Sequence, residues 1–345
     1  MERIPSPRMM IRFLLLHCLI LSFMIASANT TSITTDQQAL LALKGHVTDD
    51  PANFLAKNWD TSSFVCNWTG ITCDIRTQRV TALNISGLNL TGTIPSELGD
   101  LSSLQTLDLS FNWFSGEIPE ALGNLAELEE LWLKNNFLTG TIPSSIFNLS
   151  SLSNLDLSYN NLKGIIPSQL GNPSSLQKLF LNYNQLSGLI PSFILCKSSS
   201  LDNIRFEYKI LFGELPGELP ANICNNLPFL EILLLDENNF GSKIPSTLSR
   251  RKHLQTLLLS INDFSRAIPK EIGNLTRLKS LYLSQNRLQD FCVASKENKT
   301  VSFAIEFGKF MLSGREESVP LDQIGGFSMV DSQSPRKSIL YIFVM

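Results

Sequence analysis

Few side chains in this sequence have the types and spacing that catalysis or metal binding requires. Only three histidines occur in 345 residues, and the two beyond the amino-terminal segment, His46 and His253, are far apart and have no companion motif. Metalloprotease, paired Cys-x-x-Cys, phosphate-loop, nucleophile-elbow and protein-kinase signatures are absent from the sequence. The carboxylates are scattered, and Arg250-Arg251-Lys252 is more simply interpreted as a solvated turn than as a phosphate site. We therefore expect no enzyme, no catalytic residue, no metal and no cofactor.

Residues suited to binding are more prominent than residues suited to catalysis. In a series of L-x-L segments the middle residue is predicted to face water on a strand, and a second column of residues flanks it three positions later. Several members of both columns are aromatic or charged, which are the side-chain types that dominate interface hot spots. The alternative is that such residues are common at these positions of the pattern and have no role in binding. The candidates for ligand binding are Trp132, Asp156, Tyr159, Phe180, Tyr183, Arg205 and Tyr208.

The elements that position these candidates are copies of one repeat. The template L-x-x-L-x-L-x-x-N-x-L-x-G-x-I-P runs from Leu104 to Pro119 and recurs every 24 residues, from Leu128 and again from Leu152. Such a fixed period is the signature of a solenoid. Nine repeat starts are visible, of which the last is incomplete: Val80, Leu104, Leu128, Leu152, Leu176, Leu201, Leu230, Leu254 and Leu278.

The type of residue at each repeat position predicts its role. L-x-L has a period of two, so it predicts a short strand whose leucines face inward. One coil cannot cover its own apolar face, so the coils must stack and their strands must form a long, parallel, curved sheet. The repeated asparagine has a donor and an acceptor with which to satisfy buried backbone groups. The glycine permits a backbone conformation in the turn that other residues rarely adopt. Leu122-Gly123-Asn124-Leu125 predicts a short helical turn on the outer side, ended by its glycine.

This pattern resembles the plant-specific class of leucine-rich repeats, over about Asp36 to Leu288. The resemblance extends to Trp59 and to the stretch from Cys66 to Cys73, which are similar to that family's amino-terminal cap. It implies an α/β solenoid, a right-handed curved superhelix in which a Cys66–Cys73 disulfide helps to cover the open end. The implied divisions are a cap over residues 29–79 and a solenoid over residues 80–290.

The repeat is interrupted at several places. Leu88 and Lys209 replace the repeated asparagine, and the latter should weaken the stack because it lies in the middle. The coil from Leu201 is longer than the others, and its extra residues can loop out at a small entropic cost. Arg266 and Ser242 occupy glycine positions. After Leu288 the pattern stops, so residues 291–345 are expected to be an irregular tail that is disordered or truncated; the alternative is a divergent element that covers the last coil.

The amino terminus predicts export. Arg3, Arg8 and Arg12 precede an apolar run, and Ala26-Ser27-Ala28 supplies a cleavage pattern, so residues 1–28 are interpreted as a signal peptide. An uncleaved signal anchor that holds the chain at the plasma membrane is the alternative to secretion into the apoplast. Five cysteines remain after the signal, and no pairing is assigned to Cys196, Cys224 or Cys292. Export also predicts glycans at the Asn-x-Ser/Thr sequons Asn67, Asn84, Asn89, Asn148, Asn274 and Asn298.

The resemblance implies the extracellular half of a plant leucine-rich-repeat receptor-like kinase, with a peptide or protein ligand and a co-receptor leucine-rich-repeat kinase. This reading predicts peptide or elicitor perception in plant defence or development. A net charge of −3 gives no reason to expect nucleic acid as a partner. The main alternative is a secreted inhibitor of a microbial cell-wall-degrading enzyme, similar to polygalacturonase inhibitors. A structural adhesion module is a third interpretation.

Overall fold

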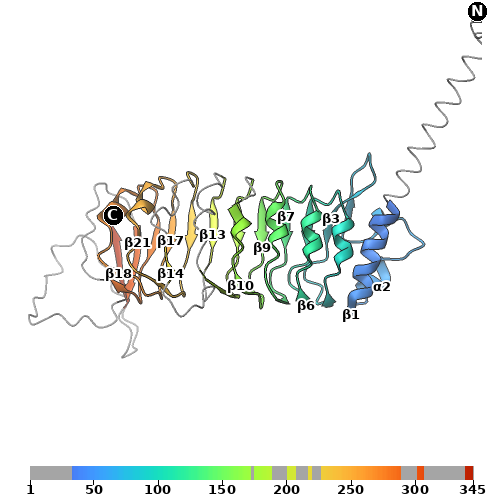
Figure 1. The fold of residues 1–345 in the computed structure, drawn as a ribbon, viewed down its shortest axis with the longest axis horizontal. Helices are drawn as coiled ribbons and strands as arrows, with labels where there is room; N and C mark the ends of the chain where they lie inside the picture. The colour runs from blue at the N-terminus through green and yellow to red at the C-terminus, as the bar shows by residue number, and fades with distance from the viewer. Residues whose placement is uncertain are drawn as a thin grey trace, which may run out of the picture.

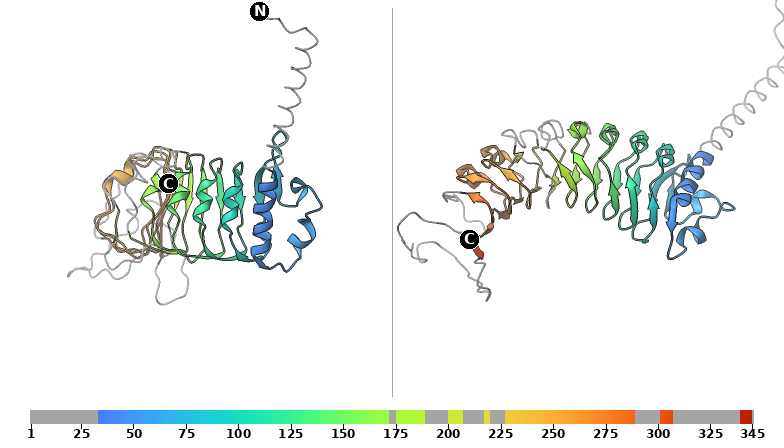
Figure 2. Two further views of the ribbon diagram at one scale, coloured as in Figure 1. Left: turned by 45° about the vertical axis from the view of Figure 1, so that its right-hand side comes forward. Right: turned by 60° about the horizontal axis from the view of Figure 1, so that its bottom comes forward.

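The chain winds into an arc of stacked coils with a helical cap at its amino-terminal end (Figure 1). The computed structural model describes residues 33–171, 175–188, 200–206, 217–219, 227–288, 301–306 and 339–344. In the right-hand view of Figure 2 the strands lie on the inner side of the arc and the short helical turns lie along its outer edge. The predicted solenoid is therefore confirmed, and its curvature creates a concave inner face.

The inner face is one continuous sheet of 12 strands. The L-x-L segments pair in parallel and in register, so that Leu107 lies beside Leu131 and Leu131 beside Leu155. Within the described residues, nine coils each contribute one strand, in agreement with the nine predicted repeat starts. These strands are β3 (Val80–Asn84), β5 (Thr106–Asp108), β7 (Glu130–Trp132), β9 (Asn154–Asp156), β11 (Lys178–Phe180), β13 (Asn203–Arg205), β15 (Ile232–Leu234), β17 (Thr256–Leu258) and β19 (Ser280–Tyr282).

In the described coils the inner strand is followed by a lateral strand, and in six of them an outer turn comes next. The lateral strands are β4 (Thr91–Thr93), β6 (Trp113–Glu117), β8 (Phe137–Thr139), β10 (Lys163–Ile165), β12 (Gln185–Ser187), β14 (Gly217–Glu218), β16 (Phe240–Gly241), β18 (Ser265–Arg266) and β20 (Arg287–Leu288). The outer turns are 3-10 helices: η2 (Ser96–Asp100), η3 (Glu120–Asn124), η4 (Ser144–Asn148), η5 (Ser168–Gly171), η6 (Ser246–Arg250) and η7 (Lys270–Asn274).

Leucines and asparagines bind each coil to the next. Leu107, Leu131 and Leu155 are fully buried, because neighbouring coils cover the apolar face that each would otherwise expose. The buried Asn160 accepts a hydrogen bond from the Leu138 amide at 3.0 Å and donates to the Leu133 carbonyl at 2.9 Å, both in the preceding coil. The same bonds recur at Asn112, Asn136, Asn184, Asn262 and Asn286.

The amino-terminal cap closes one end of this stack. Residues 33–46 are α-helical, and Ala39, Leu40 and Leu43 are buried on one side of that helix. The rings of Trp59 and Trp68 stack at 5.4 Å in the interior of the cap. The other elements of the cap are β1 (Val47–Asp49), α2 (Phe54–Asn58), η1 (Val65–Asn67) and β2 (Ile71–Cys73), and β2 pairs antiparallel with β3.

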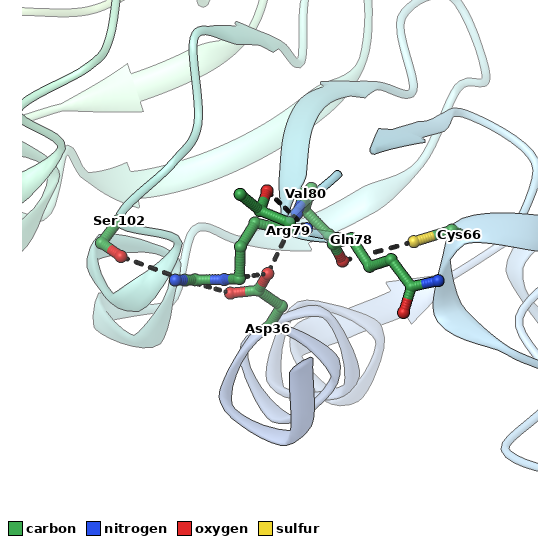
Figure 3. Close-up of polar contacts among 7 residues, drawn as sticks. Asp36, Cys66, Gln78, Arg79, Val80 and Ser102 are labelled. Carbon is green, nitrogen blue, oxygen red and sulfur yellow. Dashed lines mark hydrogen bonds and ion pairs between the residues drawn. The ribbon is translucent and has the colours of Figure 1, made fainter. Parts of the chain in front are cut away.

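A buried ion pair joins the cap helix to the first coil (Figure 3). The carboxylate of Asp36, which is 0% exposed, accepts hydrogen bonds from Nε and Nη2 of Arg79 at 2.9 and 2.7 Å and from the amide of Val80 at 3.0 Å. Arg79 also donates to Ser102, at the end of the first coil, at 3.0 Å. The hydrogen bond to Asp36 raises the pKa of Arg79. Because removing one partner of such a pair leaves an uncompensated charge, this contact fixes the cap on the stack.

The glycines of the outer turns have a different role from the one that the sequence suggested. The prediction that Gly123 ends the helical turn was wrong, since η3 continues to Asn124. A Cβ atom at Gly123 would lie 2.4 Å from Cβ of Ser145, and one at Gly99 would lie 2.3 Å from the Ala121 carbonyl oxygen. These glycines therefore allow adjacent outer turns to pack closely.

The glycines of the lateral strands do adopt the predicted turn conformation, with φ of 81° at Gly116. Ser242 and Arg266 occupy the same repeat position and keep positive φ values of 64° and 68°. Side chains are disfavoured in that conformation by about 1–2 kcal/mol, so these two coils retain the fold at the expense of local strain.

The long coil leaves the inner sheet intact. Asn203 in β13 pairs with Ile232 in β15 without a bulge, so the extra residues between these strands do not disturb the register. Lys209 lies outside the described residues. After this interruption, the Nδ2 of Asn238 donates to the Phe206 carbonyl at 2.6 Å, but its buried Oδ1 has no hydrogen-bond partner among the described residues.

Two strands from the carboxy-terminal segment extend the sheet. We expected residues 291–345 to be irregular, but β21 (Val301–Glu306) pairs in parallel with β19, and β22 (Ile339–Val344) pairs antiparallel with β21. The remainder of this segment lies outside the described residues. Neither strand carries the repeat pattern, and for that reason the sequence periodicity did not predict them.

Replacing a ladder asparagine tests how strongly the coils depend on it. We expect Asn160→Ala to lower the free energy of unfolding by about 3 kcal/mol, because buried amide and carbonyl groups of two coils lose their partners. The measurement is chemical denaturation followed by circular dichroism. Asn161→Ala is the matched control, since this neighbouring residue is only half-buried and lies outside the ladder. An equal loss in the two variants would contradict the assignment.

Candidate ligand-binding surface

The residues considered for catalysis lie apart in the structure. His46 is exposed and its Nδ1 lies 2.9 Å from the Ala42 carbonyl oxygen, whereas His253 contacts Arg277 in the next coil at 3.1 Å. No group of three or more histidine, cysteine or acidic side chains in the described ranges is arranged to hold a metal ion. The side chains that do gather at one place are aromatic, charged and amide groups on the inner face and beside it.

Four of the predicted binding residues form a row across the inner face. The parallel register places Trp132, Asp156, Phe180 and Arg205 side by side, one in each of the strands β7, β9, β11 and β13. The guanidinium of Arg205 lies over the Phe180 ring, 4.9 Å from its centroid. Trp132, Phe180 and Arg205 are half-buried, whereas Asp156 is only 4% exposed. We call these four residues the inner row.

Asp156 is the electrostatic centre of the inner row. Burial raises the pKa of its carboxyl, and the hydroxyl and amide of Ser158 oppose this by donating hydrogen bonds to Oδ1. The positive charges of Lys134 and Arg205 also act to lower it. The carboxylate is thus poorly hydrated but lies between two cations.

Polar atoms beside the inner row lack hydrogen-bond partners. Oδ1 of Asn154, Oδ1 of Asn182, Oδ1 of Asn203 and Nε of Arg205 are all buried and unpaired in the structure as described. A buried polar atom without a partner costs about 1–3 kcal/mol. Such atoms occur here in three successive coils, which makes this part of the inner face a candidate binding surface.

Tyr159 and Tyr183, which we predicted to act with the inner row, instead line a neighbouring groove. Their rings stack at 4.0 Å, and the groove has a volume of about 620 Å³ at the lateral border of the inner face. Nζ of Lys134 lies 5.4 Å from the Tyr159 ring and connects the groove to the inner row. Tyr208 lies outside the described residues.

The groove also contains Phe111, which belongs to the flanking column, and two aromatic residues that the sequence did not predict, Trp113 and Phe137. Phe111 is 50% exposed, Trp113 52% and Phe137 46%, and the rings of Trp113 and Phe137 stack at 5.3 Å. Trp113 and Phe137 each follow a ladder asparagine directly. That position, read down successive coils, was the available signal, because a residue next to the buried ladder must lie at the border of the inner face.

The backbone at three of the groove rings is in the left-handed region. Phe111, Tyr159 and Tyr183 each have a φ of 55°, a conformation that disfavours large side chains. The first coil has Gly87 at this position, with a φ of 70°. Glu237 and Ile261 occupy the same repeat position with φ values of 53° and 54°, so the left-handed conformation belongs to the repeat and not to the rings.

The structure describes some, but not all, of the features that the sequence associated with export. The Cys66–Cys73 disulfide is present in the cap. The sequon asparagines Asn67, Asn84, Asn89, Asn148 and Asn274 are all exposed, as glycosylation requires, but their modification stays a prediction. Asn298 and residues 1–28 lie outside the described part of the chain. In the part that is described, no helix combines the length and the apolar character needed to cross a bilayer.

Comparison with known protein families identifies the repeat. Residues 33–74 match a model of the leucine-rich-repeat N-terminal domain, and residues 79–101, 103–125 and 126–186 match leucine-rich-repeat models. The chain therefore carries this N-terminal domain followed by leucine-rich repeats.

Several of the proteins to which the chain is similar are plant receptors, and one is a plant ice-binding protein (TM-score 0.59, 27% identity, over 76% of this chain and 89% of that one). The chain is 44% identical over 80 residues to the LRR receptor-like serine/threonine-protein kinase EFR of Arabidopsis thaliana, an alignment that covers 23% of this chain and 8% of EFR. The structure resembles the GASSHO1/SCHENGEN3 ectodomain from Arabidopsis thaliana, solved with CASPARIAN STRIP INTEGRITY FACTOR 2, with a TM-score of 0.61, 36% identity and coverage of 73% of this chain and 33% of that one.

The Arabidopsis receptor kinase HAESA, solved with the peptide hormone IDA and the co-receptor SERK1, is also similar, with a TM-score of 0.51 and 29% identity over 73% of this chain and 50% of HAESA. The chain thus spans less than a tenth of EFR and at most half of these two ectodomains.

The raised pKa of Asp156 predicts a specific dependence of stability on pH. The folded state holds this proton more tightly than the unfolded chain, so the contribution of Asp156 to stability falls as pH rises from the ordinary value of 3.8 through the raised pKa. We expect Asp156→Asn to be more stable than the wild type at neutral pH, and the difference to shrink on acidification. The measurement is the denaturation midpoint of both proteins from pH 4 to 7.

Asp108→Asn is the control, since Asp108 accepts the same pair of bonds from Ser110 but is only half-buried. A stability difference between Asp156→Asn and the wild type that does not change with pH would contradict the assignment.

Proposed function

We propose that this chain is an extracellular ligand-recognition module of the plant leucine-rich-repeat receptor type, and that the inner row binds an extended peptide. In this proposal residues 1–28 direct export, residues 29–79 cap the solenoid, and residues 80–290 present the ligand-binding face. Perception of a peptide or elicitor in defence or development is the role that this assignment suggests.

The observation that carries the proposal is the chemistry of the inner row. It combines two half-buried aromatic rings, Trp132 and Phe180, with a desolvated carboxylate and a cation, Asp156 and Arg205. Rings supply apolar contact at a low entropic cost, and the two charges give a ligand its orientation. A basic group on the ligand would lie toward Asp156, and an acidic group or carboxylate would lie toward Arg205.

The dimensions of the inner row suit a short, extended peptide. Neighbouring strands are about 4.8 Å apart, so the four strands of the inner row span about 14 Å, or about four residues of extended peptide.

The similar proteins support the same class of ligand. The GASSHO1/SCHENGEN3 and HAESA ectodomains are described as complexes with CASPARIAN STRIP INTEGRITY FACTOR 2 and with the peptide hormone IDA. HAESA is also described with the co-receptor SERK1, and for this reason a second leucine-rich-repeat kinase is proposed as a further partner. Since a solenoid fold alone does not determine the ligand, the proposal depends on the inner row.

A peptide selection followed by substitution tests the proposal. The full chain, secreted and immobilised, would be used to select binders from a random-peptide display library. For the peptide selected, we expect Trp132→Ala and Phe180→Ala each to raise the Kd about 30-fold, the loss typical of a hot-spot residue. Phe229→Ala is the matched control, because this exposed ring (56%) lies outside the inner row.

Two outcomes would contradict the proposal. One is a selected peptide whose Kd is unchanged by both inner-row variants. The other is a selection that yields no peptide while the same immobilised chain binds a fungal polygalacturonase, since that would favour an inhibitor of wall-degrading enzymes.

A further inference from the structure

The lateral groove has a chemical character that differs from that of the inner row. Its lining consists of tryptophan, phenylalanine, tyrosine and asparagine side chains with one glycine, and the ammonium of Lys134 lies against the Phe111 and Tyr159 rings at its border. Exposed rings favour a ligand with apolar faces, whereas the amides favour hydroxyl or amide groups at the rim of that ligand. A neutral sugar satisfies both conditions, because the C–H face of a pyranose ring is apolar and its edge is hydroxylated.

One end of the groove is formed by a sequon. Asn89, in the sequence Asn89-Leu90-Thr91, is exposed and lines the groove. The Leu90 carbonyl accepts a hydrogen bond from the Trp113 amide at 2.8 Å, and Thr91 pairs with Trp113 between β4 and β6. A glycan attached to Asn89 would therefore start next to Trp113, and the Phe137 ring would follow it in the next coil.

The other described sequons lack this arrangement. Asn148 and Asn274 end the outer turns η4 and η7, Asn67 lies in the cap, and Asn84 ends an inner strand. Of the sequon asparagines that the structure describes, Asn89 alone belongs to the groove lining. The groove therefore has an occupant whose attachment point is already in place.

We propose that the N-linked glycan of Asn89 folds back into the lateral groove and that its innermost sugars pack on Trp113 and Phe137. This glycan covers rings that are about half exposed in the bare protein, and contact between an apolar face and an aromatic ring is favourable. It also excludes other molecules from the groove, so that the inner row is the surface left open to a ligand. The inference rests on the extracellular location contained in the proposed function.

A double-mutant comparison in the full secreted chain tests this packing. Thr91→Ala removes the glycan but keeps Asn89, and it would be made in the wild-type and in the Trp113→Ala background. We expect loss of the glycan to lower the Tm by about 2–4 °C in the wild type and by less than about 1 °C when Trp113 is absent. Asn148→Gln is the matched control and should give the same small shift in both backgrounds. Intact mass spectrometry would report which sequons carry glycans.

A second measurement does not depend on stability. Under native conditions, an endoglycosidase should release the Asn89 glycan several-fold more slowly than the Asn148 glycan, and Trp113→Ala should remove that difference. Equal release rates in the wild type, or equal Tm shifts on glycan loss in both backgrounds, would overturn the inference. So would a secreted chain with a glycan at Asn148 and none at Asn89, a result that leaves the proposed function intact. Absence of glycans from every sequon would instead count against export itself.

Discussion

The structure depends on one constraint: a single coil can neither bury its own leucines nor supply hydrogen-bond partners for the backbone groups of its own turn. Neighbouring coils provide the burial and the hydrogen bonds. Leu131 is covered by the adjacent strands, and Asn160 accepts a hydrogen bond from the backbone of the preceding coil and donates one to it. Because these contacts repeat in register, the coils cannot slide relative to one another. The same constraint places Trp132, Asp156, Phe180 and Arg205 in one row, although they come from four strands of the sheet.

The side chains that stabilise the stack and those proposed to bind a ligand lie on different sides of each coil. The inward leucines and ladder asparagines are buried and mostly satisfied, whereas the inner row keeps a desolvated carboxylate and unpaired amide oxygens next to it. In the lateral groove, rings at Tyr159 and Tyr183 accept a left-handed backbone. The stacked leucines supply the free energy that lets the exposed faces remain suboptimal.

The sequence predicted whatever the repeat itself determines, and little else. Leucine and asparagine spacing predicted nine parallel strands, a buried ladder and a row of residues on the inner face. The pair Asp36–Arg79 was not predicted, because its partners are 43 residues apart and belong to no repeat. The groove around Trp113 and Phe137 was missed because its members lie in positions that the template leaves open. Strands β21 and β22 carry no periodic signal, and Gly123 is explained only by its contact with the next coil.

If the proposed function is correct, the ligand contacts the inner row and no other part of the coils. Site-specific photo-crosslinking tests it most directly, with a photoreactive phenylalanine analogue placed at Phe180 or at Phe229 in the full chain and the peptide obtained by display selection as the probe. We expect the peptide to be crosslinked from position 180 and the crosslink to be lost when unlabelled peptide competes. Specific crosslinking from position 229, with none from position 180, would contradict it.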